Sequence, residues 1–282
     1  MSELPPPPPP VATTVPCKWH PERAAGRRCT RCQSPACSQC LRPASVGSIC
    51  PDCVRASKPD VATRARRWQA AQGILVTRTI IAINLAVFAI MTMSDPGMLS
   101  GRTTALHLDL GLSRLLVGSP VDLWRMLSAG FIHFGIIHLG FNMYLLFQLG
   151  SMLEPAVGRL RFAGIYLTSL LGGAVGALLL QPDGLHGGAS GAVFGLMGFA
   201  AIGYWRQGIN PMRTPIGSLL MLNLFITFVV PGISIGGHLG GALAGAVVGS
   251  IATDRRYRGT PEAIIIAGLI VGSLVVGAIV TG

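Results

Sequence analysis

Apolar residues gather in long runs after residue 78, whereas polar residues dominate the part of the chain before it. We expect helices in seven of these runs, at about residues 79–93, 135–153, 162–180, 189–205, 215–230, 235–251 and 263–280. Several runs are shorter than the ~20 residues that usually span a bilayer core, so local thinning or ragged helix ends are expected. The pattern predicts an all-α polytopic membrane protein.

Composition agrees with a membrane protein. Mean hydropathy is +0.57 and charged residues make up 12% of the chain, against roughly a quarter in soluble domains. The net charge of +11 would also suit a nucleic-acid-binding protein. Because basic residues beside apolar runs usually set membrane topology, however, we expect a bilayer and no nucleic acid.

Basic residues between the runs predict an orientation in the cell membrane. The loops at 181–188 and 231–234 contain no Lys or Arg, whereas the alternate loops contain Arg159, Arg161, Arg206, Arg213, Arg255, Arg256 and Arg258. The positive-inside rule then predicts a cytoplasmic N-terminus and an extracytoplasmic C-terminus. Arg102, Arg114 and Arg125 would lie outside, against the rule. The outer segment 94–134 is too long for a simple turn, and we expect part of it to lie in the membrane interface.

Cysteine is confined to a short segment near the N-terminus. Eight residues form four pairs of metal-ligand spacing: Cys17-x-x-His20, Cys29-x-x-Cys32, Cys37-x-x-Cys40 and Cys50-x-x-Cys53. They are enough for two tetrahedral zinc sites, which would be structural because protein ligands fill every position. Alternate pairing would place Cys17, His20, Cys37 and Cys40 on one ion; sequential pairing is also open. The arrangement resembles a B-box-like zinc finger.

These features divide the chain into five parts. We expect a proline-rich tail at 1–16, a zinc-binding module at 17–53, a basic linker at 54–78, a helical core at 79–252, and a loop with one further transmembrane helix at 253–282. The zinc module, if cytoplasmic, would be available to a cytoplasmic protein partner.

Four of the polar residues within the apolar runs are candidates for chemistry. His138 and Asn142 are spaced four apart, so they project from one helix face. Ser190 opens the run 189–205, and His238 lies near the start of the next-but-one run. Such helices run in the same direction, so both residues should lie at one end of the bundle. Each residue alone is explained by packing or interhelical hydrogen bonds; together they predict a nucleophile and a general base.

With these residues, the sequence resembles the rhomboid family of intramembrane serine proteases. The matching residues are Trp124-Arg125, His138-x-x-x-Asn142, Gly188-Ala189-Ser190-Gly191 and Gly237-His238-Leu239-Gly240-Gly241. The resemblance covers about residues 79–252 and implies a six-helix bundle, with the last run as an extra C-terminal helix. The zinc module ahead of it is similar to an arrangement in actinobacterial members.

The resemblance also implies a mechanism. Ser190 would attack a peptide carbonyl in a membrane-protein substrate, with His238 as the base and no cofactor for catalysis. His138 and Asn142 would form the oxyanion hole, with Gly188 and Gly191 shaping the site. Family members often have tyrosine at the position of Phe194, whose ring would still stack on the histidine.

Two other functions compete with a protease. A non-catalytic membrane adaptor would bind client helices while its zinc module recruits partners. The presence of both Ser190 and His238 favours the enzyme. A transporter has less support, because no intramembrane carboxylate pair is visible and Glu154 lies near a helix end.

Overall fold

The computed structural model describes residues 15–61, 63, 64, 68, 73–252 and 272, and the chain forms two compact units, Met1–Ala65 and Arg66–Gly282. Nearly all of the proline-rich tail and of the predicted seventh helix at 263–280 lies outside the described residues.

In the N-terminal unit, the described residues 15–56 form short antiparallel strand pairs followed by a helix. The pairs are β1 (Pro16–Cys17) with β2 (His20–Ala24), β3 (Arg27–Arg28) with β4 (Pro35–Ala36), and β5 (Arg42–Pro43) with β6 (Ser48–Ile49); helix α1 is Pro51–Ala56. Its buried residues are mainly cysteines, packed with Ala36, Trp19, Leu41 and Ile49. So small an apolar core contributes little stability by itself.

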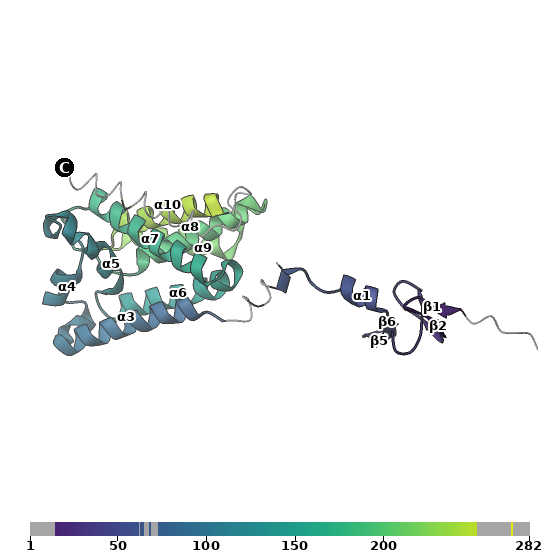
Figure 1. Cartoon of the computed structure of the whole chain (residues 1–282). Helices are drawn as coiled ribbons and strands as arrows, with labels where there is room; N and C mark the ends of the chain where they lie inside the picture. The colour runs from purple at the N-terminus through teal and green to yellow at the C-terminus, as the bar shows by residue number, and fades with distance from the viewer. Residues whose placement is uncertain (1–14, 62, 65–67, 69–72, 253–271, 273–282) are drawn as a thin grey trace, which may run out of the picture. The chain divides into compact units, whose positions relative to one another are not determined.

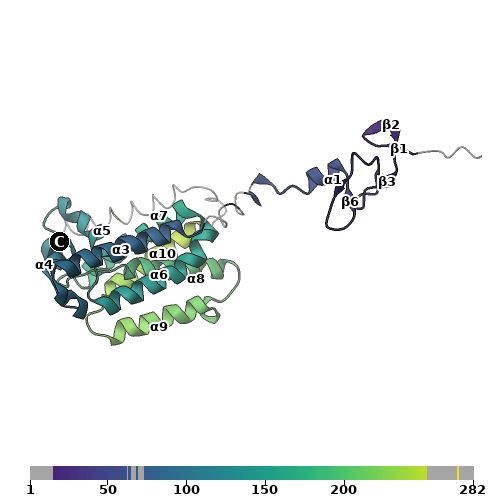
Figure 2. The same ribbon diagram turned by 90° about the horizontal axis from the view of Figure 1, so that it is seen from below.

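Among the described residues of the C-terminal unit, six long helices pack together as a bundle (Figure 1). They are α3 (Leu75–Ser94), α6 (Ile136–Val157), α7 (Arg159–Leu180), α8 (Ser190–Arg206), α9 (Pro215–Val229) and α10 (Ile235–Ala252). Among the described residues, α3, α6 and α7 are long and apolar enough to cross a membrane, while α9 and α10 are shorter apolar helices. The structure thus confirms the first six predicted runs, and α9 lies along the edge of the bundle (Figure 2).

The first helix begins four residues earlier than predicted because a carboxylate from another helix caps it. Glu154, near the end of α6, accepts hydrogen bonds from the backbone N–H groups of Val76 and Thr77 at 2.9 and 2.8 Å and from the Thr77 hydroxyl at 2.7 Å. Its side chain is buried. Helix N-termini attract negative charge through their free N–H groups, so Glu154 joins the start of α3 to the end of α6.

The segment between α3 and α6 is a chain of short helices. It contains η1 (Pro96–Ser100), α4 (Ala105–Leu110), η2 (Arg114–Leu116), η3 (Pro120–Trp124), α5 (Arg125–Ser128) and η4 (Ala129–Phe131). The Arg125 guanidinium donates to the carbonyls of Leu108, Asp109 and Gly111 at 2.8 to 3.2 Å. An isolated bridge between Leu112 and His186 joins this segment to the α7–α8 loop.

Helix α10 packs closely against both α7 and α8 through two stripes of small residues. A Cβ added at Gly236 would lie 2.1 Å from the Gly176 carbonyl oxygen of α7. Along the other stripe, a Cβ at Gly241 or Gly245 would lie 2.0 or 1.9 Å from the carbonyl oxygens of Gly191 and Gly195 in α8. Small residues let membrane helices approach until their backbones touch. This contact sets the distance between the first turns of α8 and α10.

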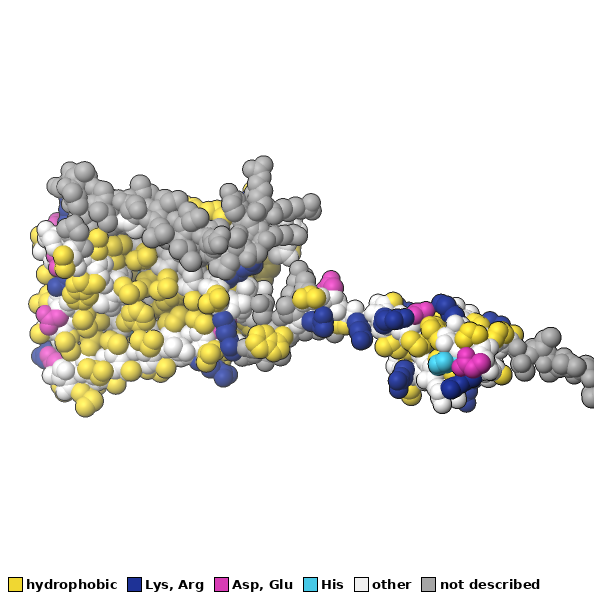
Figure 3. All heavy atoms as spheres, in the orientation of Figure 1, with side chains coloured by type: hydrophobic (Ala, Val, Ile, Leu, Met, Phe, Trp, Pro, Cys, Tyr) yellow, Lys and Arg dark blue, Asp and Glu magenta, His cyan; other side chains and the backbone are white. Residues whose placement is uncertain are grey.

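Hydrophobic side chains cover a broad band on the outside of the helical unit (Figure 3). Exposed hydrophobic side chains of this unit include Phe141, Phe147, Leu180, Phe225 and Phe228. Charged side chains gather at the two ends of the band (Figure 3). An exposed apolar surface of this kind is stable in contact with hydrocarbon rather than water. The helical unit is therefore suited to a membrane.

Candidate active site and metal centres

Ser190 and His238 lie in the first turns of two neighbouring helices. Ser190 is the first residue of α8, and His238 is the fourth of α10. A Cβ at Gly191 would be 3.3 Å from the carbonyl oxygen of Gly237, so the residues next to Ser190 and His238 are in backbone contact. The glycines therefore bring the serine and the histidine to the same end of the bundle.

The His238 ring is fixed on two sides. Phe194, one turn after Ser190, stacks on it with ring centroids 4.1 Å apart and an interplanar angle of 17°. The Thr227 hydroxyl of α9 lies 2.6 Å from Nδ1. Phe194 and Thr227 together hold the buried imidazole in place. Since Thr227 contacts Nδ1, the other ring nitrogen, Nε2, is the one left for a catalytic partner.

Among the described residues, the hydrogen bonds do not include one between Ser190 and His238. Catalytic hydrogen bonds are often long in a free enzyme and tighten when substrate binds.

Beside Ser190 lies a cavity of about 40 Å³ whose polar lining includes His186 and Ser234. Burial lowers the pKa of His186, so this ring is neutral at pH 7. By this measure of volume, a water molecule needs roughly 10–15 Å³, so the cavity has room for water next to the serine.

His138 faces the segment that leads into α8. Its Nδ1 accepts a hydrogen bond from the backbone N–H of Phe134 at 3.3 Å. A neutral imidazole that accepts at Nδ1 carries its proton on Nε2. A Cβ at Gly188 would lie 2.8 Å from that Nε2 and 3.8 Å from the Ser190 hydroxyl oxygen. His138 therefore presents a donor close to Ser190, across a residue that must be glycine.

Gly188 has a second reason to be glycine. Its φ is +126°, a value that residues with a side chain rarely adopt. Its N–H donates to the carbonyl of Ala129 at 2.8 Å, which joins this loop to η4.

Asn142 lies one turn after His138 on α6 and is buried. One N–H of its amide donates to the His138 carbonyl at 3.0 Å. Among the described residues no hydrogen bond joins Asn142 to residues 188–191. A primary amide has two N–H donors, so one remains available beside the His138 ring.

Two residues outside the sequence motifs, His133 and Thr227, also belong to this region. His133 is fully buried, and its Nε2 accepts a hydrogen bond from the Ala189 N–H at 3.5 Å, which fixes the loop before Ser190. Thr227 contacts His238 as described above. A threonine in an apolar run gives no distinctive sequence signal, whereas a histidine five residues before His138 could have drawn attention.

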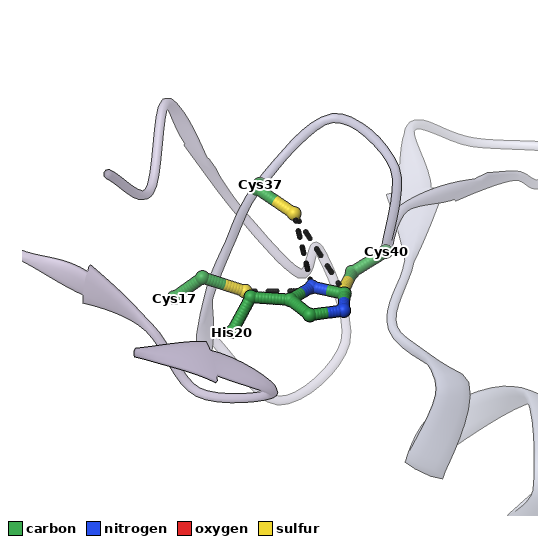
Figure 4. A group of neighbouring side chains, drawn as sticks. All are labelled: Cys17, His20, Cys37 and Cys40. Carbon is green, nitrogen blue, oxygen red and sulfur yellow. Dashed lines mark hydrogen bonds between the residues drawn. The ribbon is translucent and has the colours of Figure 1, made fainter. Parts of the chain in front are cut away.

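The N-terminal unit gathers its ligand residues into two clusters, Cys17, His20, Cys37 and Cys40, and Cys29, Cys32, Cys50 and Cys53. The structure thus shows alternate pairing, one of the two arrangements that the spacing left open. In the first cluster the four side chains point toward one another (Figure 4), and His20 presents Nδ1, 3.5 Å from Cys37 Sγ and 3.2 Å from Cys40 Sγ.

The sulfur separations fit a tetrahedral metal. Sγ atoms lie 3.7 Å apart for Cys37 and Cys40, 3.8 Å for Cys29 and Cys53, and 3.6 Å for Cys32 and Cys50. A tetrahedron with Zn–S bonds of ~2.3 Å has edges of ~3.8 Å, whereas a disulfide would bring sulfurs to ~2.05 Å. Both clusters could hold a metal ion.

The thiols of the first cluster differ in acidity. The His20 side chain beside Cys37 lowers the pKa of that thiol to about 6. Burial and neighbouring thiols raise the pKa of Cys40 to about 12. Because zinc binds the thiolate form of cysteine, a metal ion at this cluster would have to displace the proton of Cys40.

Comparison with known proteins agrees with this architecture. Residues 120–255 match the family model described as the Rhomboid domain. Rhomboid protease GluP of Bacillus subtilis (strain 168) is 33% identical over 118 residues, which are 41% of this chain and 23% of that protein. YdcA of the same bacterium is 30% identical over 124 residues, 44% of this chain and 59% of that protein.

A plant relative matches a shorter segment more closely. RHOMBOID-like protein 2 of Arabidopsis thaliana is 47% identical over 73 residues, 26% of this chain and 23% of that protein. In each of these three comparisons the chain covers less than two thirds of the relative.

Proposed function

Because this chain belongs to the rhomboid family, we propose that it is an intramembrane serine endopeptidase that cleaves transmembrane segments of other membrane proteins. The observation that carries the proposal is the placement of Ser190 in the first turn of α8, beside the first turn of α10, where Phe194 stacks on His238. A hydroxyl and an imidazole so placed in an apolar bundle are costly unless they serve a function.

In the proposed reaction, Ser190 Oγ attacks the carbonyl carbon of the scissile peptide and its proton passes to His238 Nε2. The tetrahedral intermediate collapses, the C–N bond breaks, and His238 returns the proton to the leaving amine. Water from the cavity beside Ser190 then gives a proton to His238 and attacks the acyl-enzyme, which releases the carboxylate and restores the serine.

The developing oxyanion would be stabilised by three donors. His138 carries its proton on Nε2, near the Ser190 hydroxyl, and Asn142 has one amide N–H left. The Ser190 N–H lies in the first turn of α8, where backbone donors have no acceptor inside the helix. Each such donor typically lowers the barrier by ~2.7–4 kcal/mol.

Charge at the two ends of the bundle supports a cytoplasmic N-terminus. The end where α3 begins and α6 finishes carries Arg78, Arg159, Arg161, Arg206 and Arg213. At the other end, Arg102 pairs with Asp95 at 2.5 Å, and Arg125 binds backbone carbonyls. Two of the three arginines that oppose the positive-inside rule, Arg102 and Arg125, are therefore engaged within the fold, whereas Arg114 is exposed. Ser190 would then open toward the outer face.

We also propose that the two clusters of the N-terminal unit hold structural zinc. Zinc accepts Cys₃His and Cys₄ ligand sets in closed tetrahedral sites. The unit would lie in the cytoplasm, where thiols stay reduced and a cytoplasmic protein could bind it.

A fluorophosphonate probe tests the proposed nucleophile without knowledge of the substrate. The purified full-length protein should form a covalent adduct at Ser190 in detergent, located by mass spectrometry of the digested protein. Ser190→Ala should form none, and His238→Ala should react at least 100-fold more slowly because its serine lacks a base. The absence of labelling in a folded wild-type protein would instead favour a non-catalytic adaptor.

A further inference from the structure

The His238 side chain has two ring nitrogens, and the proposed dyad uses only one of them. A neutral imidazole can carry its proton on either nitrogen. Only the form with a proton on Nδ1 leaves Nε2 free to accept the proton of Ser190. Soluble serine proteases settle this choice with a buried carboxylate at Nδ1. No Asp or Glu occurs in α8, α9 or α10, so another group must do it here.

Thr227 of α9 occupies that position. Its hydroxyl oxygen is 2.6 Å from Nδ1 of His238 and 2.7 Å from the backbone carbonyl oxygen of Asn223. A hydroxyl has one proton to donate and two lone pairs to accept. A carbonyl oxygen can only accept, so the proton between Thr227 and Asn223 must come from Thr227.

The proton between Thr227 and His238 must then come from the ring. If the hydroxyl instead donated to Nδ1, two oxygens would face each other at 2.7 Å with no proton between them, an arrangement with no compensating bond. Both contacts are satisfied together only when Nδ1 carries a proton and Thr227 accepts it. Thr227 and His238 are both buried, which strengthens such a bond relative to one in water.

We propose that Thr227 is a positioning residue that fixes His238 in the Nδ1–H tautomer and aims Nε2 at Ser190. This inference rests on the proposed dyad. Phe194 restrains the plane of the ring by stacking on it at 4.1 Å, and Thr227 restrains rotation within that plane. A helix that contributes no residue to the dyad thereby sets the protonation state of its base.

The uncharged hydroxyl differs from a carboxylate in what it supplies during the reaction. It fixes tautomer and orientation, but it stabilises the transient imidazolium only as a dipole. A tenfold change in rate corresponds to ~1.4 kcal/mol, which is the scale of one net hydrogen bond. Removal of the Thr227 hydroxyl should therefore slow the reaction about tenfold, far less than removal of the base.

Kinetics on the full-length protein test the proposal. Thr227→Val removes the hydroxyl at nearly constant shape and should lower kcat about tenfold with KM within twofold of wild type. Thr227→Ser retains the acceptor, and its kcat should stay within threefold of wild type.

Thr92→Val is the matched control. The Thr92 hydroxyl also donates to a carbonyl four residues earlier, that of Phe88 at 2.8 Å, but Thr92 lies on α3, away from His238. It should leave kcat unchanged. Thermal unfolding in the same detergent should place all three variants near wild type.

Nitrogen-15 NMR of histidine-labelled protein tests the tautomer independently of activity. The chain has six histidines, and comparison with His238→Ala assigns the signals of His238. Wild type and Thr227→Ser should show a protonated Nδ1 and an unprotonated Nε2, and Thr227→Val should lose this preference. A protonated Nε2 in the wild type, or an unchanged kcat in a folded Thr227→Val, would overturn the proposal. If Nδ1 is protonated while Ser190→Ala cleaves as well as wild type, the proposed dyad fails and the tautomer assignment stands.

Discussion

At the scale of single residues, the site depends on how closely His138 approaches the segment before Ser190. The two meet at Gly188, which has a φ of +126° and no room for a Cβ beside the imidazole. A donor for an oxyanion must be positioned within a few tenths of an ångström to act. Even the methyl group of an alanine at position 188 should therefore impair catalysis.

We predict that Gly188→Ala lowers kcat at least 100-fold, because its methyl group would displace the His138 ring from the proposed oxyanion hole and strain the loop. Steady-state cleavage in detergent measures the effect. The matched control is Gly140→Ala in α6, where an added Cβ meets nothing within 4 Å and activity should be unchanged. A Gly188→Ala variant with wild-type kcat would show that His138 has no such role.

At the scale of elements, the glycine stripes of α10 decide whether Ser190 and His238 meet. A Cβ on Gly245 would approach the Gly195 carbonyl oxygen to 1.9 Å, and both atoms belong to helix backbones that cannot move independently. The helices would have to separate along their whole contact. Stability and activity should therefore fail together.

We predict that Gly245→Ala lowers the free energy of unfolding by ~1–3 kcal/mol, the usual cost of overpacking. It should also reduce kcat, although Gly245 lies two turns from His238. Thermal or SDS unfolding in detergent measures the first effect. Gly203→Ala on α8 is the control, since an added Cβ there has no neighbour within 4 Å. Equal stability of the two variants would mean that α8 and α10 do not pack as described.

Most of the long helices and their directions could be predicted from the sequence, because a helix that spans a bilayer is encoded by a long apolar run. The parallel direction of α8 and α10 followed from the order of the runs, and it placed Ser190 and His238 at one end. The cap that Glu154 forms on α3 could not be predicted, since it joins residues 77 positions apart. The contact between Thr227 and His238 likewise depends on the rotation of α9, which an apolar sequence leaves undefined.

At the scale of the whole molecule, two units with different sources of stability share one chain. The helical unit buries a large apolar core, whereas the N-terminal unit has few apolar residues around its cysteines. The spacing of ligand pairs predicted two metal sites but not how the pairs combine, because that depends on the path of the chain between them. The alternate pairing interlocks the two sites.

We predict that the full-length protein, purified without chelator, holds about two zinc ions per chain by elemental analysis. Cys37→Ser should reduce this to about one, because Cys37 belongs only to the first cluster. Val46→Ser, an exposed position in the same unit, should retain two. A wild-type protein without zinc, or with full zinc in Cys37→Ser, would contradict the assignment.

The most direct test of the central claim is cleavage of a single-pass membrane protein in liposomes by wild type, Ser190→Ala and His238→Ala, each verified as folded. The proposed mechanism predicts cleavage within the transmembrane segment by wild type and a loss of at least 1000-fold in both variants, since a hydroxyl without a base and a base without a hydroxyl are equally ineffective. Equal cleavage by all three proteins would contradict it and assign the activity to another protease.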